Sequence, residues 1–273
     1  MGWVPPPLVP APDARLTHAF AGCLPGGRLA GPLLAFRSVA STQAVCRALA
    51  EAGAPEGTVA LADHQTAGRG RRGRVWVAPS GAALLVSCLL RPPLLPARWP
   101  DLMLVAACAV AEGLDAVAGL APRLRWPNDV LAEGRKLAGV LAEGVVGPVP
   151  FVVLGIGVNV GQGADDWPAD LAGRAVALAE LGHRVPREAV LAAILDRLAA
   201  RYDELLREGL EPTREAWRRR GAFGARIEAH GVRGVALDLA PDGALLIRAD
   251  DGETVAIASG EVAARGLAAG RAE

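Results

Sequence analysis

Apolar residues recur with a helical period in three stretches of this chain. After Pro186, one face carries apolar side chains at positions 190, 191, 194, 195, 198, 202, 205 and 206, and the pattern stops at Gly209. A second helix is predicted from Asp101 towards Gly119. A third is predicted directly after Ser41, because serine is a residue type that caps helix N-termini.

Apolar runs of strand length alternate with these helices, at residues 57–63, 83–90, 122–126, 137–143 and 151–158. After Arg220 only short runs remain, at 225–230, 232–239, 244–248 and 253–258, separated by turn dipeptides such as Asp242-Gly243. The pattern predicts a mixed α/β domain over residues 33–220 and a small antiparallel β-barrel over 221–273. Residues 1–32 contain seven prolines and are predicted to be a mostly irregular leader without a domain.

The composition excludes several classes of protein. With 52% hydrophobic and 21% charged residues, the chain is expected to fold around a sizeable core. A net charge of zero argues against a general nucleic-acid or membrane-surface binder. Apolar runs are too short to span a membrane, and the proline-broken start does not resemble a signal peptide. Four cysteines without CxxC spacing indicate buried free thiols in the cytoplasm rather than a metal cluster.

Lysine and asparagine are almost absent from the chain. Of 29 basic residues 28 are arginine, and the single lysine is Lys136. The two asparagines are Asn128 and Asn159. Because ordinary surface roles pass easily to other polar residues under such a bias, these three positions are the first candidates for a functional site.

A run of four arginines among glycines, Gly68-Arg69-Gly70-Arg71-Arg72-Gly73-Arg74, is the first candidate motif. It matches GxGxxG formally, but a strand-like segment follows instead of the helix that a dinucleotide-binding turn requires. Four guanidinium groups on a flexible loop favour a site for phosphate or carboxylate. A solvated basic loop and an RNA-binding loop remain alternatives.

Two further motifs contain the rare residues. Trp126-Pro127-Asn128-Asp129 is expected to leave the sheet at Pro127, and Arg135-Lys136-Leu137-Ala138-Gly139 follows it. Asp129 could hold a metal or a cationic partner, although a simple turn would also explain either polar residue alone. Lys136 is not part of a Walker A loop. Gly155-Ile156-Gly157-Val158-Asn159 would admit a flat ring, or would simply be a buried strand.

Together these motifs resemble the biotin–protein ligase family. The resemblance also includes Ser41-Thr42-Gln43, Gln65-Thr66-Ala67, Trp76 and the terminal sequence GEVAAR at 260–265, and it extends from about residue 36 to residue 265. It implies a catalytic domain of the biotin/lipoate ligase type with a mixed sheet, followed by an SH3-like barrel. It also implies a cytoplasmic enzyme that forms biotinyl-5′-AMP from biotin and MgATP and then transfers biotin to a lysine of a biotin carboxyl carrier domain.

The resemblance assigns roles to individual residues. Lys136, Arg71 and Asp129 would be catalytic, with Asp129 near the metal. The residues implied to bind biotin are Ser41, Thr42, Gln43, Gln65, Arg69, Gly70, Arg71, Lys136 and Gly139. Those implied to bind ATP or the adenylate are Arg71, Arg72, Arg74, Trp76, Asn128, Asn159 and Arg265.

The chain departs from the family pattern in three places. Arg125 stands where the family usually has lysine, and the barrel has no tryptophan after Trp217. The Pro-rich leader is not expected to form the helix-turn-helix domain of regulatory members. We therefore expect no sequence-specific DNA binding, and a homodimer formed edge to edge is compatible with the family. Two alternatives stay open: a lipoate or octanoate transferase, and a non-catalytic adenylate or RNA binder.

Overall fold

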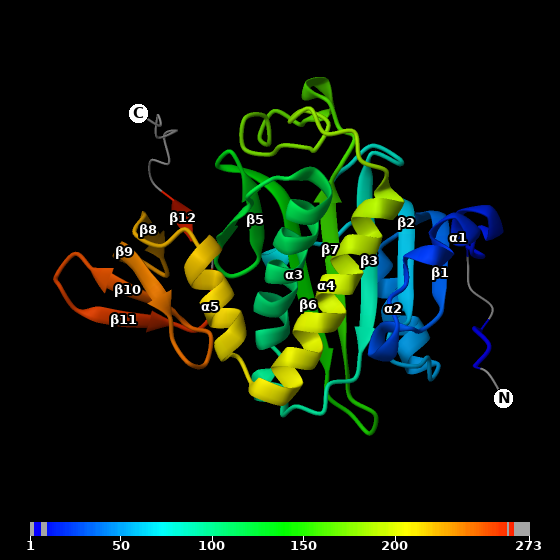
Figure 1. Ribbon diagram of the computed structural model, residues 1–273, viewed down its shortest axis with the longest axis horizontal. Coiled ribbons are helices and arrows are strands. Elements are labelled where there is room, and N and C mark those ends of the chain that lie inside the picture. The colour runs from blue at the N-terminus through cyan, green and yellow to red at the C-terminus, as the bar shows by residue number, and fades with distance from the viewer. Residues whose placement is uncertain (1–2, 7–9, 261, 265–273) are drawn as a thin grey trace.

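A seven-stranded sheet forms the centre of the protein, with the strand order β1-β2-β3-β7-β6-β5-β4 (Figure 1). The computed structural model describes residues 3–6, 10–260 and 262–264. The strands are β1 (Leu33–Val39), β2 (Val59–Gln65), β3 (Ala83–Leu90), β4 (Arg123–Arg125), β5 (Asp129–Ala132), β6 (Arg135–Val145) and β7 (Phe151–Asn159). β1 and β2 are parallel, and all other neighbours are antiparallel.

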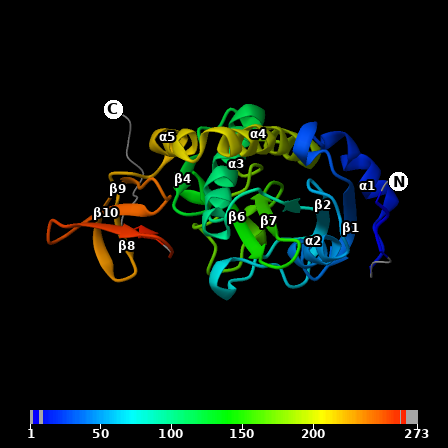
Figure 2. The same ribbon diagram turned by 90° about the horizontal axis from the view of Figure 1, so that it is seen from below.

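Helices cover both faces of this sheet (Figure 2). They are α1 (Ala14–Phe20), α2 (Thr42–Glu51), α3 (Asp101–Ala118), α4 (Arg187–Glu208) and α5 (Glu211–Arg220). α3 and α4 lie side by side on one face, and α2 packs on the other. A Cβ atom on Gly113 would lie 2.9 Å from the Cα of Ile194, so glycine is what allows α3 and α4 to approach so closely. Because the sheet is covered twice, every residue of β3 is buried.

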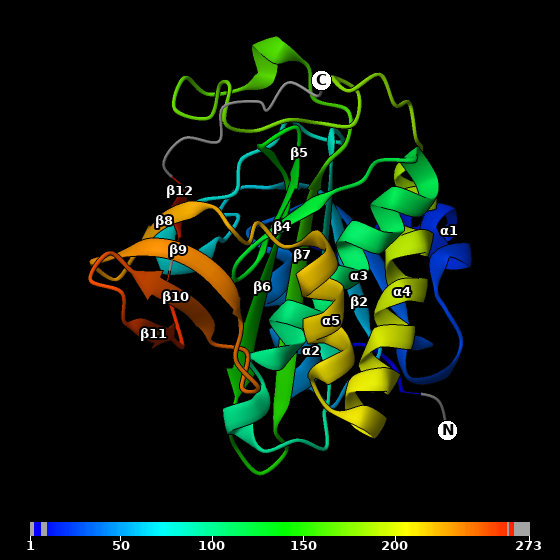
Figure 3. The ribbon, with the colours of Figure 1, turned by 60° about the vertical axis from the view of Figure 1, so that its left-hand side comes forward.

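The C-terminal part is a five-stranded antiparallel sheet beside α5 and β4 (Figure 3). Its strands are β8 (Arg226–Ala229), β9 (Val232–Leu239), β10 (Leu245–Ala249), β11 (Thr254–Ile257) and β12 (Ala263–Ala264), in the order β11-β10-β9-β8-β12. The indole Nε1 of Trp126 donates to Gly243 O at 3.1 Å, which ties the two sheets together. The predicted fold class, a mixed α/β domain followed by a small antiparallel β module, is confirmed.

Most predicted elements are present with small shifts at their ends. The helices predicted after Pro100 and Pro186 are α3 and α4, and Gly119 ends α3 in the left-handed conformation. Five of the α-helices and strands were not predicted, namely α1, β1, β5, α5 and β12. β5 is only four residues long, and α5 is so rich in charged residues that no apolar period marks it. The division into domains at residues 32 and 220 stays a prediction.

The expectation that residues 1–32 are mostly irregular is wrong for their second half. Asp13 caps α1 by accepting a hydrogen bond from Leu16 N at 2.7 Å. Leu16 and Phe20, one turn apart, are buried in the same core cluster as β1 and α4. The surrounding prolines concealed this pair in the sequence, because a helix of seven residues shows too little periodicity to stand out.

No helix in the part of the chain that the structure describes is long and apolar enough to cross a membrane. All four cysteines are free and buried.

We expect the four thiols of the native chain to resist an aromatic disulfide reagent at about pH 8. Burial raises the pKa of the Cys88 thiol to about 12, and it also raises the pKa of Cys23, Cys46 and Cys108. Because only the thiolate reacts, release of the coloured leaving group should follow unfolding by denaturant. Rapid modification of any of these cysteines in the native chain would contradict this expectation.

Candidate active site

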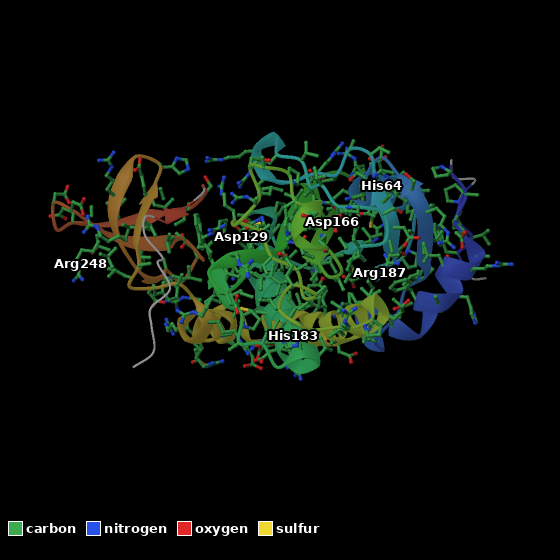
Figure 4. All side chains as sticks on the ribbon, turned by 90° about the horizontal axis from the view of Figure 1, so that it is seen from above. His64, Asp129, Asp166, His183, Arg187 and Arg248 are labelled. Carbon is green, nitrogen blue, oxygen red and sulfur yellow. The ribbon has the colours of Figure 1, made fainter. Side chains whose placement is uncertain are left out.

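A cavity of about 320 Å³ lies over the sheet, between the first turn of α2 and the connection from β7 to α4. Asp129, which borders it, lies towards the C-terminal sheet, whereas His64 and Arg187 lie on the β1–β2 side (Figure 4). The cavity brings together most of the residues that the sequence singled out: Ser41, Thr42, Gln43, Gln65, Arg69, Gly70, Arg71, Arg74, Trp76, Asn128, Asp129, Lys136, Gly139 and Asn159. Arg72 does not line it, and Arg265 lies outside the described residues.

The first turn of α2 forms one end of the cavity. Ser41 is the N-cap residue, but its hydroxyl makes no capping hydrogen bond, which corrects the role expected for it. Gln65 Oε1 accepts from the main-chain N of Thr42 at 2.7 Å and from its hydroxyl at 3.0 Å. Gln43 Nε2 donates to Leu141 O at 3.2 Å across the sheet. Side chains from α2 and β2 thus hold each other at the helix N-terminus.

The arginine loop, residues 68–76, is held at its base by main-chain contacts. Trp76 N donates to Gly68 O at 3.1 Å, and a Cβ on Gly68 would lie 2.4 Å from Trp76 O, so the loop can close only with glycine there. Near its tip, Arg71 donates to Gly260 O at 2.7 Å and lies 3.5 Å from Asn128 Oδ1. Arg72 turns away from the cavity, with Nη2 3.1 Å from His230 Nε2. The loop therefore touches both sheets.

The indole of Trp76 lies on two glycines of the sheet. Gly139 and Gly157 are cross-strand partners in β6 and β7. A Cβ on Gly157 would lie 2.8 Å from the Trp76 ring, and one on Gly139 would lie 3.2 Å from it. Lys136 Nζ lies 5.5 Å from the centre of the same ring. The sequence predicted that the small residues of the segment 155–159 would admit a flat ring. In this structure, the indole of Trp76 lies against Gly157.

Lys136, Asp129 and Arg125 form a charged triad at the other end of the cavity. Lys136 Nζ lies 2.6 Å from Asp129 Oδ1, and Arg125 donates to Asp129 Oδ2 at 2.6 and 3.2 Å. Burial by itself raises the pKa of Asp129, but the charges and hydrogen bonds of Lys136 and Arg125 outweigh it and lower that pKa below its ordinary value. Asp129 is thus a carboxylate at neutral pH that fixes two cations.

Both asparagines use their amide nitrogens to hold the main chain. Asn128 Nδ2 donates to Val140 O at 2.8 Å. Asn159 Nδ2 donates to Lys136 O at 3.2 Å and to Val176 O at 3.1 Å. Contacts of either asparagine with a nucleotide stay a prediction.

The connection from β7 to α4 contributes residues that the sequence did not indicate. It arches over this end of the sheet (Figure 1) and lines the cavity with Trp167, Leu171, Gly173, Arg174 and Ala175. Trp167 Nε1 donates to Glu180 Oε2 at 2.9 Å, which fixes the indole. The segment has neither helical nor alternating periodicity, and only the tryptophan could have drawn attention to it.

Several buried polar atoms at the cavity have no hydrogen-bond partner among the described residues, namely Ser41 Oγ, Gln43 Oε1 and Trp76 Nε1. Because an unsatisfied buried polar atom is costly, these atoms fit a ligand with polar edges. The same part of the chain contains no group of three or more histidine, cysteine, aspartate or glutamate side chains placed to hold a metal ion.

Comparison with known proteins agrees with this geometry. Residues 35–159 match the model of the biotin/lipoate A/B protein ligase family, and residues 226–265 match the biotin protein ligase C terminal domain. The chain is 36% identical over 222 residues to the bifunctional ligase/repressor BirA of Bacillus spizizenii, covering 78% of this chain and 68% of that protein. It is 36% identical over 233 residues to the biotin–[acetyl-CoA-carboxylase] ligase of Mycobacterium tuberculosis, covering 81% and 85%.

Among solved structures, the biotin protein ligase of Aquifex aeolicus in complex with biotin and ATP superimposes with a TM-score of 0.75 at 30% sequence identity. The match covers 85% of this chain and 98% of that one.

Proposed function

This chain belongs to the biotin protein ligases of the biotin/lipoate A/B protein ligase family, and from that premise we propose that it activates biotin with ATP and attaches it to protein. In the first step, a biotin carboxylate oxygen bonds to the α-phosphorus of ATP, which gives biotinyl-5′-AMP and releases pyrophosphate. In the second, a lysine amine of a biotin carboxyl carrier domain attacks the activated carbonyl. An amide forms, and AMP and the amine proton leave.

The two unlike ends of this cavity carry the proposal. Ser41, Thr42 and Gln43 offer neutral hydrogen-bonding groups at one end, whereas Lys136 and the arginine loop offer positive charge at the other. The reaction requires this division, because the neutral ring of biotin must be held while its carboxylate and a triphosphate are brought together. Cations fixed beforehand reduce the repulsion between the two anions.

Lys136 is the residue best placed to act on the reacting centre. Its ammonium is held between Asp129 and the Trp76 ring, at the charged end of the cavity. A compact point charge at that position would stabilise negative charge on the carboxylate and then on the tetrahedral intermediate of the transfer step. Arg71 and Arg74, which also line the cavity, would bind the phosphates.

Asp129 does not fit the role of a dedicated magnesium ligand. Its two carboxylate oxygens are already paired with Lys136 and Arg125. In this proposal magnesium enters with ATP as part of the nucleotide substrate, and Asp129 positions the two cations. The buried free thiols support the reducing conditions of the cytoplasm as the compartment.

The unpartnered polar atoms favour biotin over lipoate or octanoate. The ureido ring of biotin has both donors and acceptors, which Ser41 Oγ and Gln43 Oε1 could satisfy. The dithiolane ring of lipoate and an alkyl chain have no strong hydrogen-bonding group, so the same atoms would stay unsatisfied.

One incubation tests the assignment. The chain is mixed with MgATP, biotin and a biotin carboxyl carrier domain, and the carrier is weighed by mass spectrometry. We expect a mass increase of one biotinyl group, together with biotin-dependent exchange of pyrophosphate into ATP. Turnover with lipoate or octanoate but not with biotin would replace the proposal by its nearest alternative, and absence of turnover with all three would indicate a binding protein.

Gly157→Ala is expected to weaken biotin binding about tenfold, because the added Cβ displaces the Trp76 ring and such overpacking costs about 1–3 kcal/mol. Titration calorimetry with biotin measures this change. Gly147→Ala is the matched control, since nothing lies within 4 Å of a Cβ at Gly147. Equal affinity in the two variants would show that Trp76 does not shape the biotin site.

A further inference from the structure

Lys136 lies at an irregular point of the central sheet. β5 pairs Val130 with Ala138 but Leu131 with Lys136, so β6 has one extra residue, Leu137, in a bulge. On its other side, β6 pairs with β7 only from Ala138 onward. The main chain of Lys136 therefore lies beyond the regular β6–β7 ladder, and its position must be fixed on that side by something other than a neighbouring strand.

The connection from β7 to α4 supplies these contacts. Lys136 N donates to Arg174 O at 2.8 Å, and Lys136 O accepts from Val176 N at 3.0 Å. The side chain of Asn159 bridges the same two segments, because its Nδ2 donates to Lys136 O and to Val176 O. Both amide hydrogens of Asn159 are thus used to join the lysine to the segment that covers the cavity.

Gln162 determines the orientation of that bridging amide. Its side chain is fully buried, and its Nε2 donates to Asn159 Oδ1 at 3.0 Å. Its Oε1 accepts from Val160 N at 2.8 Å, so both ends of the glutamine amide are bonded. A donor directed at Asn159 Oδ1 leaves Nδ2 facing the two carbonyl oxygens. Without the donor from Gln162, the amide of Asn159 could flip and place its oxygen against the carbonyl oxygens of Lys136 and Val176.

We propose that Gln162 is a positioning residue for Lys136, acting through Asn159. The glutamine fixes the asparagine amide, the amide fixes the main chain of Lys136 against residues 174–176, and the ammonium is thereby held 2.6 Å from Asp129 Oδ1. The contribution to catalysis rests on the proposed function. The positioning itself does not, because every link is a contact within the protein.

The single lysine allows this positioning to be measured directly. An amine-specific acylating reagent can modify only one lysine side chain, and the mass of the peptide that contains residue 136 reports its labelling rate. Gln162→Met preserves the length of the side chain and removes both hydrogen bonds. We expect Lys136 to be labelled about tenfold faster in this variant, the factor that corresponds to one buried hydrogen bond. We also expect kcat for pyrophosphate exchange to fall about tenfold with a much smaller change in KM for biotin, since Ser41 and Gln43 lie at the other end of the cavity.

Thr58→Val is the matched control for a general loss of stability. Thr58 is fully buried, and its hydroxyl donates to Pro55 O at 2.7 Å at the start of β2, away from the cavity. This variant should melt at a lower temperature while the labelling rate of Lys136 stays that of the unchanged chain. Equal labelling rates in Gln162→Met and Thr58→Val would overturn the proposal.

A second variant keeps the test decisive if Gln162→Met does not fold. Gln162→Glu retains the acceptor for Val160 N, and its ionised carboxylate cannot donate to Asn159 Oδ1. At a pH where this carboxyl is ionised, the variant should also accelerate labelling of Lys136; an unchanged rate there would contradict the proposal. The labelling reaction contains neither biotin nor ATP. Failure of the ligase assignment would appear instead as absence of exchange in the unchanged chain, which separates the two outcomes.

Discussion

Replacing Lys136 by arginine is expected to slow biotin-dependent exchange of pyrophosphate into ATP by about 10²–10³-fold, comparable with the loss of one oxyanion donor. Arginine retains the positive charge, so the loss of rate must come from the different shape of the guanidinium group. Lys136 Cε and Nζ lie 3.0 Å from the Cβ position of Gly139, and Nζ lies 2.6 Å from Asp129. A broad planar guanidinium cannot enter this space without moving Asp129 or Trp76.

Initial-rate measurements with labelled pyrophosphate test this expectation. Arg135→Lys serves as the control, because it is the opposite substitution at the adjacent position. Arg135 pairs there with the exposed Glu133. The control should retain the rate of the unchanged chain. A Lys136→Arg variant that exchanges pyrophosphate at nearly the normal rate would show that any cation suffices at this position.

Arg71→Gly is expected to release biotinyl-5′-AMP about 10²-fold faster than the unchanged chain, which corresponds to the loss of about two charge-assisted hydrogen bonds. The guanidinium of Arg71 reaches Gly260 O and Asn128 Oδ1 from the arginine loop. Its removal would both take a cation from the phosphates and detach the loop from the C-terminal sheet. The adenylate would then escape into solution before a carrier domain arrives.

Escaped adenylate is detected by the biotin that it leaves on the lysines of an added bystander protein such as albumin. Background from the enzyme is small, because the chain has one lysine. Arg47→Ala, which removes an exposed arginine paired with Glu51 on α2, is the control and should label the bystander no more than the unchanged chain. If Arg71→Gly labels only the carrier lysine, retention of the adenylate does not depend on this arginine.

Periodicity predicted the fold where elements are long or bounded by clear signals. α3 and α4 keep an apolar face over many turns, and the C-terminal strands are separated by glycine turns with positive φ, such as Gly243. α1 and β5 are too short to show a period, and α5 packs through only a few buried side chains, chiefly Trp217, among charged residues. Short elements are fixed by tertiary contacts that a local pattern does not contain.

The candidate site was largely predictable because its residues are chemically unusual in this chain. Lys136 and the two asparagines stood out by rarity, and the structure places all three at one cavity. The contact of Arg72 with the nucleotide stays a prediction, and nothing in a run of arginines shows that this one lies beside His230. Gln162 and residues 167–175 were missed because their role depends on a bulge and on strand ends, which become visible only when the register is known.

The glycine pair beneath Trp76 has a consequence for how this site can change over generations. Gly139 and Gly157 face each other across two strands under one ring, so a side chain at either position displaces the same indole. The first substitution already displaces the indole, so a second one should weaken ligand binding little further. The effect of the double substitution should therefore be smaller than the sum of the two single effects. Mutations at the two positions are therefore expected to be coupled in evolution. In a double variant, restoring glycine at one position would leave the Trp76 ring displaced by the side chain at the other.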